Sequence, residues 1–166
     1  MRIDFEKHHD NVYRFALNLS RDPHLAEDLT QECFLRAHQR INQLKNARGV
    51  KPWLFQILVN LWKDNLKKKR PQYLNNELLD PTGKSPSAEV NQLENEAYDQ
   101  LINLMQTLPE QQRSVLFLKA VEQFSNSDIA KLLGKSENSV KANLSIARKT
   151  MRGKLSQLSK EKTKAK

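Results

Sequence analysis

The side chains with the clearest potential for specific chemistry lie between positions 138 and 155. An apolar stripe recurs there every three or four residues, which predicts one buried helix face, at Val140, Leu144, Ala147, Met151 and Leu155. The opposite side of this helix is polar and basic, at Asn138, Lys141, Ala142, Ser145, Lys149 and Arg152. Lysine and arginine pair with phosphates, and polar or small residues contact base edges in the major groove. The pattern therefore favours contact with duplex DNA.

A short helix before this one would position it. Ser125 and Asp128 have capping-box spacing, in which a Ser oxygen accepts a free backbone N–H at the start of a helix. Gly134 suits the left-handed conformation that ends a helix, and Ser136 can cap the next one. Two helices joined by a tight glycine turn predict a helix-turn-helix. An ordinary helical hairpin with a solvated lysine face is the alternative.

A helix expected from about 51 to 69 carries a second set of residues that could bind a specific partner. Its predicted core side holds Leu54, Phe55, Leu58, Leu61 and Trp62. Its other side mixes an aromatic ring, amides and lysines, at Trp53, Gln56, Asn60, Lys63 and Lys67. Such a mixture suits stacking on unpaired bases and pairing with their phosphates. The basic run 67–70 before Pro71, where we expect the helix to stop, is also explained by simple solvation.

The helix expected from Asp22-Pro23 to about Ile41 has an acidic outer face. Asp22 is a predicted N-cap, with proline at the first helical position. The predicted core positions are Ala26, Leu29, Cys33 and Ala37, and the outer ones are Asp28, Gln31, Glu32, Leu35 and Gln39. An apolar side chain inside a polar rim is typical of a docking surface for another helix. A leucine exposed by chance is the other interpretation.

Composition agrees with a nucleic-acid partner. The 166 residues carry a formal charge of +9, and a strongly basic chain favours polyanions. We expect a cytoplasmic protein with no membrane insertion, because the apolar runs are too short to span a bilayer and the N-terminus has no signal-peptide pattern. Cys33 is the only cysteine, which excludes an intramolecular disulfide.

Catalysis, a metal site and a cofactor are not expected. His8 and His9 are adjacent, so they point to different sides of a helix and lack the spacing of a metal-binding pair. The sequence contains no glycine-rich phosphate loop and no nucleophile elbow.

The chain is predicted to be all-α, with two small helical domains joined by a flexible acidic linker. We place the first domain at 1–70, the linker at 71–92, the helix-turn-helix domain at 93–157 and a disordered basic tail at 158–166. The first domain would open with a helix from about Asp4 to Leu19. The linker would merge into a helix near Ser87 that ends at Leu108-Pro109, followed by a helix from Gln112 to Val121.

Both halves resemble the extracytoplasmic-function (ECF) group of sigma-70 RNA polymerase sigma factors. The similar segments are AEDLTQECFLRAHQRI at 26–41, PWLFQILVNLWKDNLKKKR at 52–70 and LPEQQRSVLFLKAVEQFSNSDIAKLLGKSENSVKANLSIARKTMRGKL at 108–155. The resemblance implies a non-enzymatic initiation factor. Its implied partners are core RNA polymerase, through the beta-prime clamp helices and the beta flap, promoter DNA and an anti-sigma factor.

The resemblance also implies roles for individual residues. The implied polymerase contacts are Asp28, Gln31, Glu32 and Leu35. The minus-10 element would be recognised by Trp53, Gln56, Asn60, Lys63 and Lys67, together with the segment 42–48. The minus-35 element would be recognised by Asn138, Ser139, Lys141, Ala142, Asn143, Ser145, Ile146, Lys149 and Arg152.

The sequence departs from the family pattern at several of these positions. Gln56, Val59, Asn143 and Ile146 stand where the family often has arginine, and Lys135 occupies a turn position that is usually apolar. Promoter sequence therefore does not transfer from relatives. A stand-alone helix-turn-helix repressor or activator is the alternative function, although such proteins usually bind as dimers and no dimerisation coiled coil is evident.

Overall fold

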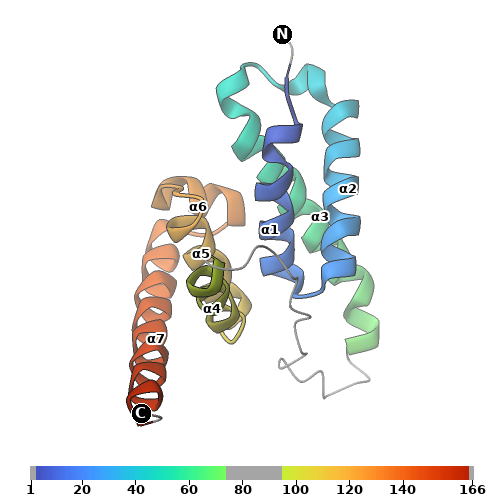
Figure 1. The fold of residues 1–166 in the computed structure, drawn as a ribbon. Coiled ribbons are helices and arrows are strands. Elements are labelled where there is room, and N and C mark those ends of the chain that lie inside the picture. Colours follow the sequence, from blue (N-terminus) through green and yellow to red (C-terminus); the bar gives the residue numbers. More distant parts are fainter. Residues whose placement is uncertain (1–2, 74–94, 165–166) are drawn as a thin grey trace. The chain divides into compact units, whose positions relative to one another are not determined.

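The protein folds as two separate helical units, as the sequence predicts. The computed structural model describes residues 3–73 and 95–164, and the units comprise Met1–Pro86 and Ser87–Lys166 (Figure 1). The described residues of the first unit form α-helices and short 3-10 turns, and those of the second unit form α-helices joined by turns.

The first unit is built on three α-helices. A 3-10 turn, Glu6–His8, leads into α1 (His9–Ser20), which is followed by α2 (Pro23–Gln39) and α3 (Val50–Tyr73). Each helix contacts the other two, and the rings of Phe15 on α1 and Phe55 on α3 meet edge to face with centroids 5.1 Å apart. These two rings and the buried apolar residues of α2 form the core of the unit. This core determines which faces of α2 and α3 point outward.

Local signals set the boundaries of these helices. Arg21 adopts a left-handed conformation after α1, and Asp22 Oδ1 accepts the backbone N–H of His24 at 3.0 Å at the start of α2. Between α2 and α3 the chain forms two 3-10 turns, Ile41–Gln43 and Ala47–Gly49. Asn46 Oδ1 accepts the Gly49 N–H at 3.0 Å and holds the second turn.

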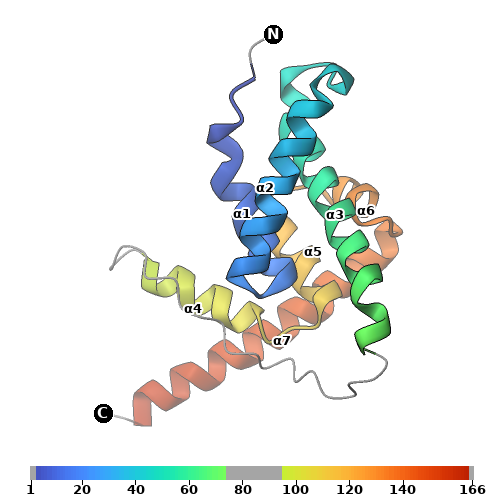
Figure 2. The ribbon, with the colours of Figure 1, turned by 90° about the vertical axis from the view of Figure 1, so that its right-hand side faces the viewer.

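The second unit contains α4 (Asn95–Met105), α5 (Glu110–Ala120), α6 (Asn126–Leu133) and α7 (Glu137–Lys164). The long helix α7 contacts the other three, and its C-terminal part continues beyond them (Figure 2). Arg113 of α5 is buried, and its Nη1 donates to the Leu108 carbonyl at 2.8 Å. This bond ties the turn between α4 and α5 to the helix that follows it.

Three sequence-based expectations about helix ends are wrong. The helix expected to stop at Pro71 continues to Tyr73. Proline removes a backbone donor and crowds the preceding turn, but its φ is fixed at about −65°, which is a helical value. The tail expected to be disordered is helical to Lys164. Leu155, expected on the buried stripe of α7, is 45% exposed because it lines an open groove beside α4 and α5. The predicted linker falls almost wholly at 74–94, outside the described residues, as does the helix start near Ser87.

Candidate protein and nucleic-acid interfaces

The helix-turn-helix is formed by α6 and α7, with the caps that the sequence predicts. Ser125 Oγ accepts the backbone N–H of Asp128 at 3.1 Å, and Ser136 Oγ accepts that of Ser139 at 3.1 Å. Gly134 adopts φ 66° and ψ 41° between the helices, the left-handed region that favours glycine. Ser125 thus fixes where α6 begins, Gly134 where it ends and Ser136 where α7 begins.

The predicted DNA-binding residues of α7 lie together on its outer surface. The exposed members are Asn138, Lys141, Ala142, Ser145, Ile146, Lys149 and Arg152. Ser139 and Asn143 are half-buried, and the Asn143 amide donates to the Ser139 carbonyl at 3.0 Å. Asn143 is therefore held against its own helix in this structure, whereas the lysines and Arg152 extend into solvent.

Arg148 is a basic residue of this surface that the sequence analysis missed. With Asn126, Lys141, Ser145 and others it lines a small polar pocket of about 220 Å³ between the start of α6 and α7. The signal was present in the sequence, because Arg148 lies three residues after Ser145 and four before Arg152. Residues at that spacing are neighbours on a helix surface.

The outer face of α3 has the predicted composition. Trp53 and Gln56 are half-buried, while Asn60, Lys63 and Lys67 are exposed. Gln56 Nε2 donates to Asn60 Oδ1 at 3.2 Å, so the two amides are already paired along the helix. Along successive turns, this face therefore presents the Trp53 ring, the hydrogen-bonded amides of Gln56 and Asn60, and the ammonium groups of two lysines.

The outer face of α2 is acidic around an apolar centre. Leu35 is 53% exposed, more than any other large apolar side chain on the described surface. Asp28 and Gln31 are exposed, and half-buried Glu32 accepts the Arg36 Nε–H at 2.9 Å. The arginine of α2 is thus engaged with its own helix, which leaves the outward charge of the face negative.

The inner face of α2 is fixed by Cys33. The side chain is fully buried, and its Sγ donates to the Leu54 carbonyl of α3 at 3.4 Å. Burial raises the pKa of the Cys33 thiol to about 12, because a thiolate would lose its hydration there, and nearby Arg36 opposes this only in part. Cys33 is a packing residue, as predicted, and it locks the rotation that turns Leu35 outward.

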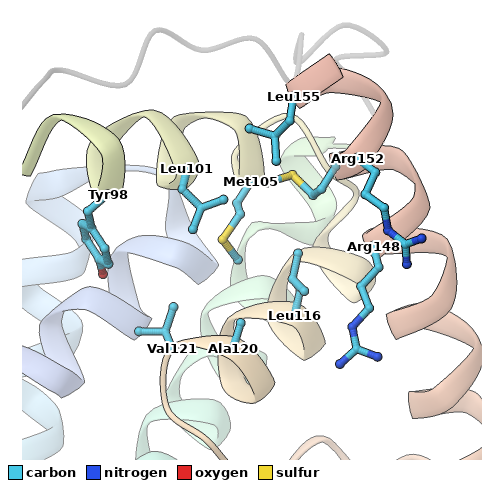
Figure 3. Close-up of a pocket in the computed structure, with 10 residues that line it drawn as sticks. Tyr98, Leu101, Met105, Leu116, Ala120, Val121, Arg148, Arg152 and Leu155 are labelled. Atoms are coloured by element: carbon cyan, nitrogen blue, oxygen red, sulfur yellow. The ribbon is translucent and has the colours of Figure 1, made fainter. Parts of the chain in front are cut away.

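The second unit also contains an open apolar groove between α4, α5 and α7. We call this the apolar groove; it has a volume of about 490 Å³ and is lined by Tyr98, Leu101, Met105, Leu116, Ala120, Val121, Arg148, Met151, Arg152 and Leu155. Figure 3 shows the aliphatic and Met side chains converging, with both arginines along one side. Arg148 and Arg152 line both this groove and the polar pocket beside α6.

Two absences among the described residues bear on function. Residues 3–73 and 95–164 hold no group of three or more His, Cys, Asp or Glu side chains that could bind a metal. The helices in these same ranges are too short or too polar to cross a membrane.

Comparison with known proteins gives the family. The model of sigma-70 region 2 matches residues 5–72, and the model of sigma-70 region 4 matches residues 98–151. The chain is 31% identical over 159 residues to the ECF RNA polymerase sigma factor SigM of Bacillus subtilis, with 92% of this chain and 94% of SigM covered. The chain belongs to the ECF group of the sigma-70 family of transcription initiation factors.

Other sigma factors extend the comparison. Identity to the probable sigma factor RfaY of Xanthomonas campestris is 37%, over 89% of this chain but only 38% of RfaY, so the match spans well under half of that protein. Identity to SigW of B. subtilis is 29%, over 90% of this chain and 85% of SigW. Sigma region 2 contains the acidic face of α2 and the face of α3, and sigma region 4 contains the helix-turn-helix.

Two solved structures share the fold, and one of them is a sigma factor. RpoE of Bartonella quintana, crystallised with the anti-sigma factor NepR, matches with a TM-score of 0.76 and 22% identity over 92% of this chain and 94% of that one. CnrH, solved with the cytosolic domain of CnrY, matches with a TM-score of 0.61 and 19% identity over 92% of this chain and 85% of that one.

Proposed function

We propose that this sigma factor binds core RNA polymerase through the outer face of α2 and directs it to promoters through α3 and α7. The observation that carries the assignment is the exposure of Leu35 at the centre of an acidic and amide-bearing helix face. Protein interfaces combine a desolvated apolar anchor with a polar rim. Asp28, Gln31 and Glu32 supply the rim, and their charge suits a basic partner helix such as a polymerase clamp helix.

The outer face of α3 would bind the opened minus-10 element. Trp53 offers a ring on which an unpaired base can stack, and Lys63 and Lys67 continue along the helix toward the phosphates. The paired amides of Gln56 and Asn60 can still contact a base edge, since each amide group retains further donors or acceptors. The loop of 3-10 turns at residues 41–49 leads into this face and could extend the contact.

The outer face of α7 would enter the major groove of the minus-35 element. Ser139, Ala142, Asn143, Ser145 and Ile146 would face bases, while Asn138, Lys141, Lys149 and Arg152 would contact the backbone. Few of these side chains can form the bidentate pairs with bases that give strong discrimination. Sequence preference upstream should therefore be modest, and promoter choice should depend more on α3.

The second unit would contribute its own protein contact through the apolar groove. Helix-shaped partners lay an apolar face into such grooves, and the polymerase beta flap is the occupant that we propose. RpoE, which has a similar fold, is bound to the anti-sigma factor NepR, and we propose that this chain is likewise held inactive by an anti-sigma factor. These roles place the chain in the cytoplasm and require no catalysis by it.

A two-step experiment tests the proposed function. Tagged protein is first tested for retention of purified core RNA polymerase, and the resulting complex is then used for run-off transcription on random genomic fragments. We expect retention and discrete transcripts that the core enzyme alone does not produce. Tight, specific DNA binding by the free protein as a dimer, without retention of polymerase, would instead support a stand-alone repressor or activator.

A further inference from the structure

A second cavity, in the first unit, has no role in the assignments above. It lies between the N-terminal turn, α1 and α2, has a volume of about 490 Å³, and is lined by Phe5, Glu6, His9, Asp10, Gln31, Phe34 and His38. We call it the aromatic pocket. Its walls come from residues 5–10 and from one side of α2, so both belong to the same folded unit.

Four rings pack against one another in its wall. The rings of His9 and Phe34 are nearly parallel, 12° apart, with centroids separated by 5.7 Å. Phe5 meets His38 edge to face at 4.7 Å and Phe34 at 6.2 Å. Because Phe5 is 7% exposed, it anchors the cluster, while Phe34 stays half-open to solvent. A wall fixed in this way offers ring surface without the cost of ordering it on binding.

The open rim of the pocket is acidic. Glu6 and Asp10 line it, both exposed, and Gln31 of α2 completes the polar rim. Two carboxylates beside aromatic faces attract a cation for two reasons, because carboxylates carry full negative charge and ring faces carry a negative quadrupole. A DNA phosphate would be repelled by the same carboxylates, which argues against an unpaired nucleotide as the occupant.

The aromatic pocket continues the acidic face of α2. Gln31 belongs to both surfaces, because it lies three residues before Phe34 and four before Leu35, the proposed anchor, and residues at these spacings are neighbours on a helix surface. A partner helix lying on Leu35 would therefore pass the mouth of the pocket. A long lysine or arginine side chain from that helix could enter while its backbone stays on α2.

We propose that the aromatic pocket binds one basic side chain, lysine or arginine, of the polymerase segment that docks on α2. The inference rests on the proposed function, in which the outer face of α2 contacts core polymerase. It adds a charged contact beside the apolar anchor Leu35. Residues of α1 and of the 3-10 turn before it make this contact. The guanidinium or ammonium group lies against Phe34 and is paired with Glu6 and Asp10.

The test measures binding of full-length variants to purified core RNA polymerase. Glu6→Lys combined with Asp10→Asn removes both carboxylates from the rim, and we expect at least about tenfold weaker binding, since breaking a close interfacial charge pair costs more than tenfold. Lys7→Glu is the matched control, because Lys7 is exposed on the same turn but does not line the pocket. We expect it to bind polymerase as well as the parent.

A second pair of variants tests the ring. Phe34→Leu keeps an apolar side chain but removes the ring face, and we expect roughly two- to thirtyfold weaker polymerase binding, the range for removal of a cation–π interaction. Phe34→Tyr is the control, because it keeps an aromatic ring at this position, and we expect it to bind polymerase as well as the parent. Melting temperatures of all variants distinguish a weakened interface from a damaged core, since only variants that melt like the parent enter the comparison.

The outcomes separate this proposal from the proposed function. If Leu35→Asp abolishes polymerase binding while the rim and ring variants bind normally, the pocket has no part in docking although α2 does. If Leu35→Asp binds normally, docking on α2 itself is wrong. If Phe34→Leu leaves polymerase affinity unchanged but weakens binding of single-stranded promoter DNA by the complex, the pocket holds a base, and the proposal of a basic side chain is overturned.

Discussion

Helices α2 and α7 pack in the same way but present opposite charges to solvent. Each buries one apolar face against its own unit and exposes the other. The 17 residues of α2 contain three acidic residues and one arginine, and that arginine pairs with Glu32. The 28 residues of α7 contain eight lysines and arginines against two glutamates. Both buried faces are apolar, so in our proposal it is the charge of the outer face that selects the class of partner.

The two helices also differ in what accompanies the charge. On α2 a single leucine sits among acidic and amide groups, an arrangement that gains affinity from desolvation. On α7 the basic groups spread over several turns, an arrangement that gains affinity from displaced counterions. A protein contact should therefore depend on one residue, and a DNA contact on many small and salt-sensitive contributions.

The largest expected effect is at Leu35. Leu35→Asp puts a charge at the centre of the proposed anchor, and we expect polymerase binding to weaken by roughly thirtyfold or more, because truncating a well-buried anchor often costs about 2 kcal/mol. Melting should stay close to that of the parent, since surface changes usually remain within about 0.5 kcal/mol. Polymerase retention and thermal melting on the same samples measure both quantities.

Leu35→Met is the matched control for this change. It keeps an apolar side chain of similar size, so we expect near-normal polymerase binding. A large drop in melting temperature for Leu35→Asp would show that this leucine supports the core, and the contrast between α2 and α7 would then lose its basis.

An intermediate effect is expected on the basic face of α7. Replacing Lys141, Lys149 and Arg152 by alanine should lower the slope of log affinity against log salt, by about 0.9 for each side chain that pairs with a phosphate in the complex. The measurement is binding of a minus-35 duplex by the polymerase complex across a salt series.

The matched control removes the same number of charges farther along α7. Lys160, Lys162 and Lys164 lie near the end of the helix, beyond the helix-turn-helix. We expect their replacement by alanine to change the slope less than replacement of the first set. Equal changes in the slope from both sets would mean that DNA responds to the total charge of α7. The outer face of α7 would then not lie in the major groove.

The smallest functional effect is expected at Cys33, which lies on the buried side of α2. We expect the thiol to resist alkylation near pH 8 in the folded protein and to react once the protein unfolds, because burial raises its pKa to about 12. Rates of modification with and without denaturant measure this. Rapid modification of the folded protein would mean that α2 is rotated or loosely packed.

The raised pKa also gives a pH dependence of stability. Between about pH 9 and pH 12 the unfolded chain loses the thiol proton while the folded chain keeps it. The free energy of unfolding must therefore fall as pH rises through this window, relative to a Cys33→Ala variant that has no thiol. Denaturant titrations of both proteins at pH 8 and pH 10 test the sign.

The sequence predicted those features that depend on local signals. Asp22, Ser125 and Gly134 act within a few residues of themselves, and each occupies the capping or turning position expected of it. The outward orientation of Leu35 and Trp53 followed from helical periodicity, which needs no knowledge of neighbouring helices. The two-domain helical fold followed from the same patterns, whereas the family followed from the resemblance of both halves to ECF sigma factors.

Features that depend on contacts between distant residues were not predictable in this way. The aromatic pocket brings Phe5 and His9 together with Phe34 and His38. The spacing of residues within one helix does not predict this contact between two segments. The pairing of Gln56 with Asn60 required one of several available rotamers. Arg148 is a different case, because its spacing from Ser145 and Arg152 was visible in the sequence, although it lies at the border between the apolar stripe and the opposite side.

The length of α7 connects ionic strength to the secondary structure of the chain. Lys162 and Lys164 lie in its last turn, where positive charge interacts favourably with the helix dipole by about 0.3–1 kcal/mol per residue. Summed over both lysines, this exceeds the repulsion of the like-charge pair Lys160 and Lys164, about 0.2–0.5 kcal/mol, and so favours a helix that continues beyond the last packed residues. Salt screens the dipole interaction and shifts the helix–coil equilibrium of this end toward coil. In the proposed complex, a rise in salt that weakens the contact of the middle of α7 with phosphates would thus also shorten the helix from its C-terminal end.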